Sequence, residues 1–176
     1  MGRRSSSVSW KCSATGRVRS SAGSGRRWIA DRFSPHRLPE RIEGRSYAII
    51  IELKKDARVR TRSREFRLES GRYIYCGSAR TNIEARIRRH LISTKRKFWH
   101  IDYLLAAGGR VIEVWTFDGI DECDIASVCM DEGATPVAGF GSSDCARCPA
   151  HLFAILDIDS NSLFSRCAQL ANSSGS

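Results

Sequence analysis

The stretch that first suggests chemistry is GRYIYCGSARTNIEARIRRH, residues 71–90. Two tyrosines precede a turn of small residues, and a helical pattern rich in arginine follows it. A helix that begins after such a turn presents backbone N–H groups and a partial positive charge, which attract phosphate. We therefore predict a phosphate-binding corner. Its expected DNA or phosphate contacts are Gly77, Ser78, Arg80, Lys95, Arg96 and Lys97.

The phenols of this stretch could add catalysis to binding. A tyrosine close to arginine groups or to a metal ion loses its proton more easily and can then activate a water. Tyr73 and Tyr75 differ by two positions, so they share one face of the predicted strand. Tyr75 is nearer to the turn and is the predicted site residue, whereas Tyr73 is expected to pack in the strand.

Arg86 is the helix arginine most suited to a site. The apolar stripe of the helix recurs every four residues: Ile83, Ile87 and Leu91. At about 100° per residue, Arg86 lies on the border of that stripe, while Arg88 and Arg89 point away from it. A half-covered guanidinium group needs an anionic partner, which is either a substrate phosphate or a structural acid, Glu84 or Asp102.

Two histidines are also candidate catalytic residues. His90 lies four residues after Arg86 and so shares its helix face, where it could contact phosphate. His100 follows Trp99 and could act as a proton shuttle. For both, ordinary packing in the core is the alternative interpretation.

The seven cysteines form no evident disulfide framework, so reduced thiols are expected. Cys145-x-x-Cys148-x-x-His151 has the spacing of zinc ligands on one loop, and Cys123 is a candidate fourth ligand. A single Cys-x-x-Cys pair is weak support for zinc, so free loop thiols are the default interpretation and a structural zinc ion is the alternative.

The elements that must position these residues follow from local patterns. Apolar and alternating runs predict strands at 46–55, 57–68, 71–77, 110–117 and 151–156. Helices are predicted from a Thr81–Glu84 capping box onward, at 98–109, at 122–133 with Asp121 as its cap, and for a short stretch near 160–171. Residues 136–151 are predicted to be a loop. The order of these elements predicts a compact α+β domain.

Length and charge suggest one domain with two tails. The chain has 176 residues, for which we predict a disordered basic Ser/Arg-rich tail at 1–36, a domain at 37–157 and a C-terminal tail at 158–176. With 29 Lys+Arg against 19 Asp+Glu, the net charge of +10 favours a nucleic-acid partner. An organelle transit peptide is the alternative for the basic N-terminus. Since no apolar run approaches the ~20 residues that span a bilayer, we expect a soluble cytoplasmic protein.

Several short motifs occur in a characteristic order: SYAII (46–50), YCGSA (75–79), RIRRHL (86–91), WHIDYLL (99–105), EC (122–123), GFGSSDC (139–145) and HLF (151–153). Together they resemble the GIY-YIG nuclease superfamily, to which the nuclease half of the excision-repair protein UvrC belongs. The resemblance is closer to a small prokaryotic branch of that superfamily and covers about residues 41–156. It implies a small, mainly antiparallel sheet flanked by helices.

The resemblance also implies roles for particular residues. Tyr47 matches the general base of the first motif, while Tyr75 and Gly77 match the second motif, which orients the reacting groups and shapes the turn. Arg86 matches the arginine that stabilises charge on the phosphate. Glu122 matches the single carboxylate that holds Mg²⁺, or Mn²⁺ in its place.

Two positions depart from the superfamily pattern. Arg45 stands two residues before Tyr47, where glycine is usual, with Gly44 one step earlier. The superfamily also often has a late asparagine, for which Ser143 or Asp144 are the nearest substitutes here. Without the resemblance, Tyr47 would be interpreted as a core aromatic residue and Glu122 as a first-turn acid.

The sequence therefore predicts a divalent-metal-dependent DNA endonuclease, with DNA repair or recombination as its setting and a repair protein as a candidate partner. The main alternative is a nucleic-acid-binding module of the same fold that does not catalyse. A zinc-stabilised interaction domain is the third hypothesis.

Overall fold

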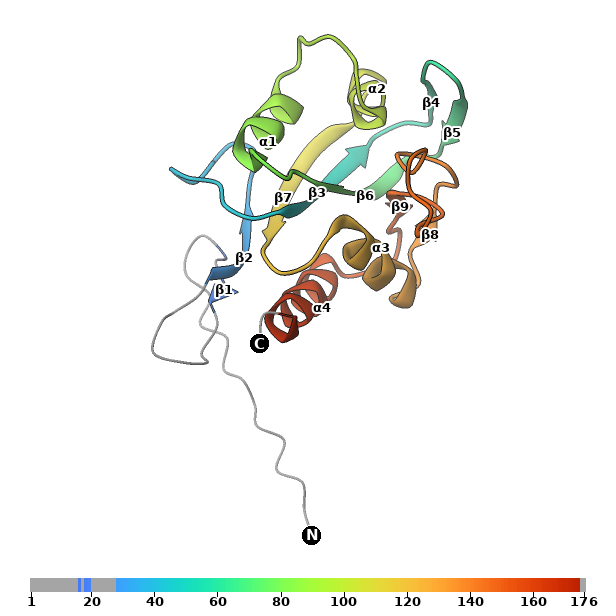
Figure 1. The fold of residues 1–176 in the computed structure, drawn as a ribbon. Helices are drawn as coiled ribbons and strands as arrows, with labels where there is room; N and C mark the ends of the chain where they lie inside the picture. Colours follow the sequence, from blue (N-terminus) through green and yellow to red (C-terminus); the bar gives the residue numbers. More distant parts are fainter. Residues whose placement is uncertain (1–15, 17, 20–27, 175–176) are drawn as a thin grey trace.

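The computed structural model describes residues 16, 18–19 and 28–174. It contains a seven-stranded sheet in the order β1-β2-β7-β3-β6-β9-β8, in which every neighbouring pair is antiparallel (Figure 1). The strands are β1 Val18–Arg19, β2 Trp28–Phe33, β3 Ser46–Leu53, β6 Gly71–Ser78, β7 Arg110–Phe117, β8 Thr135–Pro136 and β9 Leu152–Ala154. A separate ribbon consists of β4 Ala57–Arg60 and β5 Glu65–Leu68.

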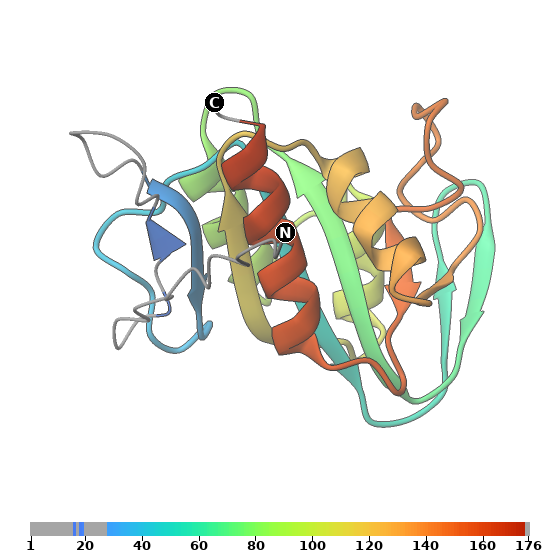
Figure 2. The same cartoon turned by 90° about the horizontal axis from the view of Figure 1, so that it is seen from below.

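Helices cover both faces of the sheet (Figures 1 and 2). The two short helices lie on one face and the two longer ones on the other: α1 Ile83–Leu91 and α2 His100–Ala106, then α3 Glu122–Asp131 and α4 Ser160–Ser173. This arrangement confirms the predicted α+β class with a small antiparallel sheet flanked by helices. Within the described residues, none of the helices combines the length and hydrophobicity that crossing a bilayer requires.

Strand β3 shows why the sheet has two cores. Its side chains alternate between faces, yet almost all are buried. Tyr47 and Ile49 belong to the core under α1 and α2, whereas Ala48 and Ile50 belong to the core under α3 and α4. A strand covered on both sides needs a continuous apolar run, which is what SYAIIIEL provides.

The helix caps confirm one prediction and correct another. Asp121 caps α3 as predicted, because its carboxylate accepts hydrogen bonds from the amides of Cys123 (2.8 Å) and Asp124 (2.9 Å). The predicted Thr81–Glu84 capping box is wrong. Asn82 is the N-cap instead, and its side-chain oxygen accepts the Ala85 amide at 2.8 Å. Asparagine caps helices at least as well as threonine, and here it lies one residue later.

The fold extends beyond the predicted domain at both ends. Strand β2 pairs with β7, with Ala30 opposite Phe117, so the predicted tail 1–36 is wrong for residues 28–33. The predicted disorder of residues 1–15, 17 and 20–27 lies outside the described residues. At the other end, α4 is longer than the predicted short helix and packs against α3 and β2. Its apolar positions, interspersed with Ser and Asn, are Leu163, Phe164, Cys167, Ala168 and Ala171.

Candidate functional site

The site is built around the phenol of Tyr47 at the start of β3. Gly77 lies directly opposite Tyr47 on β6, and directly paired residues share a face of the sheet. A Cβ atom on Gly77 would approach the Tyr47 hydroxyl oxygen to 2.5 Å and its ring carbon to 2.4 Å. Gly77 therefore leaves the space in which the phenol lies, a steric role that adds to its predicted role in the turn.

Tyr47 is hydrogen-bonded to His90 of α1. Its hydroxyl lies 2.9 Å from His90 Nε2, and the two residues are 1% and 2% exposed. Burial raises the pKa of Tyr47 above its usual range, and the positive charge of Arg86 only partly opposes this. Burial lowers the pKa of His90, which is therefore a neutral imidazole at neutral pH. Because His90 Nδ1 faces Asp102 at 3.8 Å, we assign the ring proton to Nδ1, and Nε2 accepts the Tyr47 hydroxyl.

Asp102 of α2 organises the charges behind this pair. Its buried carboxylate accepts hydrogen bonds from Arg89 Nη1 (3.0 and 3.1 Å) and from the backbone amides of Phe98 (2.9 Å) and Trp99 (3.0 Å). Although burial alone would raise the pKa of Asp102, these contacts and His90 hold it below its usual range. The prediction that Arg89 points away from the core is therefore wrong, because its guanidinium group turns toward a buried acid.

Lys95 also faces this network. Its ammonium group donates to the backbone carbonyls of Arg89 and His90, at 2.8 Å each, and lies 3.4 Å from Asp102. Its side chain is 10% exposed. Lys95 therefore caps the C-terminus of α1. In this position it contacts the protein, although the sequence suggested a phosphate contact.

Arg86 differs from the next two arginines of α1 in its ion pairing. Its guanidinium group stacks on Trp99, 4.5 Å from the ring centroid, and that of Arg89 stacks on the same ring at 4.4 Å. The structural partners considered for it are already engaged, since Glu84 pairs with Arg88 and Asp102 pairs with Arg89. Within the part of the chain that the structure describes, no carboxylate lies within ion-pair distance of Arg86. A half-buried cation beside Tyr47 is thus available to an anionic ligand.

Tyr75 forms the wall next to this pair. Its ring lies 6.4 Å from that of His90, and a Cβ on Gly141 would approach the Tyr75 ring to 3.2 Å. Among the described residues, its hydroxyl has no hydrogen-bond partner, and burial raises its pKa. The hydroxyl of Tyr73 instead donates to the Glu69 carbonyl at 2.8 Å. This buried structural bond fits the predicted packing role of Tyr73.

The remaining predicted contacts lie at the margins. His100 packs against Phe66 and Phe140, with ring centroids 6.3 and 5.5 Å away, and not against the Tyr47–His90 pair. Arg80, Arg96 and Lys97 are exposed, and Ser78 is partly exposed at the end of β6. These side chains can reach a ligand from solvent without forming part of the buried site.

Glu122 is the first residue of α3 and is half-buried. Its negative charge acts to raise the pKa of both Tyr47 and His151, although burial has the larger effect on each: it raises the pKa of Tyr47 and lowers that of His151. The described residues gather no second carboxylate into a metal-binding group with it. One carboxylate nevertheless fits Mg²⁺, which keeps several of its waters and shares substrate oxygens.

The residues at the two departures from the superfamily pattern do not cover Tyr47 with their side chains. Arg45 does not fill it, because its side chain is 84% exposed and lies 4.0 Å from Asp118. Gly44 adopts a φ of 128°, which side-chain-bearing residues rarely reach, so this position requires glycine. Ser143 and Asp144 are exposed on the loop before β9.

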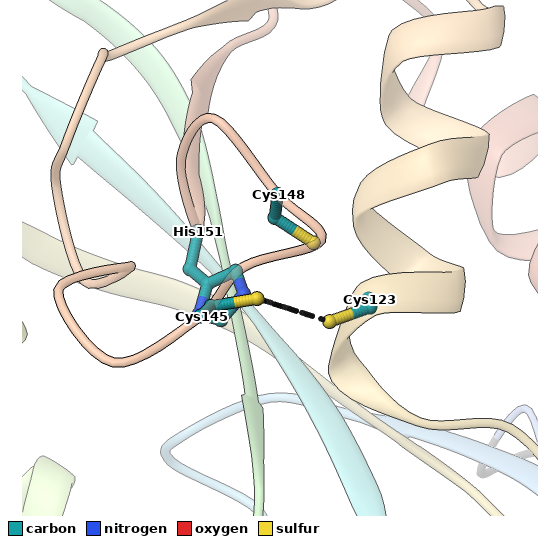
Figure 3. Close-up of side chains that lie close together, drawn as sticks. All are labelled: Cys123, Cys145, Cys148 and His151. Carbon is teal, nitrogen blue, oxygen red and sulfur yellow. Dashed lines mark hydrogen bonds between the residues drawn. The ribbon is translucent and has the colours of Figure 1, made fainter.

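A second cluster lies at the N-terminus of α3 (Figure 3). The ligand atoms of its four members all lie within 4.8 Å of one another: Cys123, Cys145, Cys148 and His151. We call this group the cysteine cluster. Burial alone would raise the pKa of Cys145, but the backbone N–H groups of Arg147 and Cys148 and the neighbouring thiols lower it. The structure thus brings together all four residues that the spacing suggested.

Sequence reasoning missed a polar row across the sheet. Asp31 on β2 lies opposite Thr116 on β7, which lies opposite Tyr47 on β3. Directly paired residues share a face, so the buried hydroxyl of Thr116 lies between the buried carboxylate of Asp31 and Tyr47 on one face of the sheet. The acid of the motif WIADRF was the available signal, but it fell in the segment assigned to the tail.

Fold and site together define a small α+β chain with a buried Tyr–His pair and a cysteine cluster; Arg86, half-buried beside the pair, has no acidic partner among the described residues. The model of the family described as "Domain of unknown function DUF123" matches residues 46–173. The chain belongs to this family, and the match continues through α4. No curated protein and no solved structure matches the chain significantly.

Proposed function

We propose that the chain is a divalent-metal-dependent nuclease that hydrolyses phosphodiester bonds in DNA. The observation that carries this proposal is the position of Arg86, packed beside Tyr47 without an acidic partner in the described part of the chain, although Arg88 and Arg89 each have one. The ordered motifs that resemble the GIY-YIG superfamily and the net charge of +10 give further support.

Because burial raises the pKa of Tyr47, its phenol carries its proton before the reaction and is not a tyrosinate. Tyr47 can therefore take a proton from water only if it passes its own hydroxyl proton on. As water attacks phosphorus, the phenol oxygen of Tyr47 takes the proton of that water, and the Tyr47 hydroxyl proton passes to His90 Nε2. The imidazolium ion that forms faces Asp102. The leaving oxygen takes a proton from solvent, and His90 later returns its proton to solvent through Tyr47.

Charge on the phosphate needs two compensating groups. Arg86 would bind the non-bridging oxygens with its planar guanidinium group, already held in position by Trp99. Glu122 would hold Mg²⁺ or Mn²⁺ beside the same phosphate. The ion, when bound, supplies further stabilisation of the developing charge.

Access to Tyr47 requires a local opening. The phenol is 1% exposed, and Arg86 and Trp99 lie on the helix side of it. Both residues stand near the solvent-exposed segment 92–98 between α1 and α2, which carries Arg96 and Lys97. In the proposal, a bound phosphate draws Arg86 outward and admits the attacking water.

The test uses the full chain with branched, nicked and supercoiled DNA, with magnesium, manganese or EDTA. The wild type should cleave at least one of these substrates only with the metal. Arg86→Ala should reduce cleavage by about 10²–10³-fold. Arg88→Ala is the matched control, since it removes an arginine of the same helix that already pairs with Glu84, and it should cleave normally.

A non-catalytic nucleic-acid-binding module is the second candidate, and the burial of Tyr47 favours it. It predicts salt-sensitive DNA binding by the wild type with no cleavage of any substrate in either metal. That result, or full cleavage by Arg86→Ala, would contradict the nuclease proposal.

A further inference from the structure

The four side chains of the cysteine cluster come from two separate segments. Cys123 lies in the first turn of α3, whereas Cys145, Cys148 and His151 follow one another on the loop before β9 (Figure 3). The Cys123 sulfur lies 3.5 Å from that of Cys145 and 4.0 Å from His151 Nε2. Around a tetrahedral zinc ion with Zn–S bonds of ~2.3 Å, ligand atoms lie about 3.6–3.8 Å apart. These two distances are close to those of a coordination shell, and none of the four ligand atoms is more than 4.8 Å from another, so small movements would close the shell around an ion.

Contacts outside the four ligands hold the two segments together. Arg147, between the two loop cysteines, pairs with the N-cap Asp121 at 2.7 Å and with Asp124 at 3.2 Å. The backbone of His151 is fixed as well, since its amide donates to Phe140 and its carbonyl accepts from Cys76, at 2.8 Å each. The ligands therefore sit on backbone held in place by other bonds.

We propose that these four residues bind one structural Zn²⁺ ion. Three thiols release their protons to solvent on binding, and neutral His151 contributes the lone pair of Nε2, so three negative charges meet two positive ones. Arg147 lies beside the resulting single negative charge. The four protein ligands complete a tetrahedron and leave no position for water, as in structural rather than catalytic zinc sites.

Disulfide bonds are a poorer explanation of the cluster. The six described cysteines are all free, and three thiols cannot pair without leaving one over. Cys123, Cys148 and His151 are each less than 10% exposed. Three convergent thiols, two of them buried, have no other polar function in the described structure, and a soft divalent ion satisfies all of them at once.

A bound zinc ion would also hold in place two parts of the neighbouring proposed nuclease site. Glu122 immediately precedes Cys123, and Gly141 lies on the loop that carries the other three ligands, where a Cβ atom would approach the Tyr75 ring to 3.2 Å. The zinc ion would thus hold both the carboxylate and one wall of the proposed nuclease site, a consequence that rests on the proposed function. Zinc content does not depend on that function, because it is measured without any substrate.

The experiment measures metal in the full chain purified under reducing conditions with zinc supplied. We expect about one zinc per chain. Replacement by Co²⁺ should give thiolate-to-cobalt charge-transfer absorption and the visible bands of tetrahedral cobalt. Less than a tenth of an equivalent of zinc without these bands, or iron with sulfide in place of zinc, would overturn the proposal.

Variants separate coordination from folding. Cys145→Ser, the most accessible ligand change, should lose most of the zinc and lower Tm by roughly 5 °C or more. His151→Cys keeps four ligands and should retain zinc. Its cobalt-substituted form should show stronger thiolate-to-cobalt charge-transfer absorption, because it has four thiolates in place of three. Cys167→Ala removes a buried thiol outside the cluster and should keep one zinc. Equal zinc content in Cys145→Ser and Cys167→Ala would contradict the site, whatever the result of the cleavage assays.

Discussion

Two polar clusters at opposite faces of the sheet differ in how their charges are balanced. Under α1 and α2, the buried carboxylate of Asp102 is met by Arg89, Lys95 and backbone amides. In the cysteine cluster, three thiols and an imidazole converge with no cation among them. In the first cluster, the carboxylate and the cations that face it are paired with one another, and only Arg86 has no anionic partner among the described residues. In the cysteine cluster, the thiols would find their partner in the proposed ion.

This difference distinguishes a site suited to a transient substrate from a site suited to a permanently bound structural ion. A cation left over from a satisfied network is free to hold a transient anion such as a phosphate. A closed shell of four ligands holds its ion permanently, because no position remains open for substrate. The predictions below test each side of this contrast.

The largest expected effect comes from the phenol. In the proposed mechanism, Tyr47→Phe removes the oxygen that takes the water proton, so cleavage should fall by about 10²–10⁴-fold while DNA affinity is kept. Tyr73→Phe is the control, because its hydroxyl bonds only to the Glu69 carbonyl. It should cleave normally. Comparable cleavage by the two variants in single-turnover assays would break the contrast between the catalytic and the packing tyrosine.

Stability should depend most on the buried acid. Asp102→Asn leaves Arg89 and Lys95 without their carboxylate and should lower the free energy of unfolding by about 3–5 kcal/mol. Glu84→Gln breaks the exposed pair with Arg88 and should cost less than about 1 kcal/mol. Urea denaturation measures both. Similar losses would show that Asp102 is not the centre of the network.

A smaller effect should appear with pH. His90 has a lowered pKa when folded, so its contribution is present above about pH 6.5, the unfolded value. Below that pH the unfolded chain takes up a proton that the folded chain refuses, and stability falls by up to about 1.4 kcal/mol per pH unit. The titratable groups around the ring are Tyr47, Tyr75, Asp102, Lys95 and Arg89.

His90→Gln cannot take up that proton, so its stability should fall less steeply between pH 7 and pH 5. Both proteins keep the cysteine cluster, and acid effects there cancel in the comparison. Parallel pH profiles of the free energy of unfolding would show that His90 is not held neutral in the folded chain.

The smallest effects concern the surface. Arg96→Ala and Lys97→Ala remove exposed charges and should each reduce the slope of log affinity for DNA against log salt by about 1. Lys95→Met should lower stability and leave the slope unchanged, because its ammonium group caps α1. A reduced slope in Lys95→Met would place this lysine on the DNA-binding surface after all.

The regular elements could be predicted because their local patterns agree with their burial. The run SYAIIIEL is apolar on both faces and becomes the central strand β3, and Asp121 caps α3 where expected. Strand β2 was hidden because its six residues follow a basic, serine-rich segment, and pairing with β7 depends on contacts distant in sequence. Helix α4 was underestimated because Ser and Asn separate its apolar positions.

The site was predictable in its members but not in its contacts. The i, i+4 spacing placed Arg86 and His90 on one helix face, and the loop spacing brought Cys145, Cys148 and His151 together. Helix periodicity could not show that Arg89 reaches back to Asp102, because a long side chain can turn toward a buried acid on another helix. Nor could it show that Tyr47 bonds to His90, which requires the crossing of α1 over β3.

The most direct test of the account is cleavage by Glu122→Gln, with zinc content measured in the same sample. The account predicts about one zinc per chain, unchanged DNA binding, and loss of magnesium-dependent cleavage by about 10²-fold or more. Cleavage at the wild-type rate by this zinc-loaded variant would contradict the central claim that Glu122, Tyr47 and Arg86 act together on a phosphate.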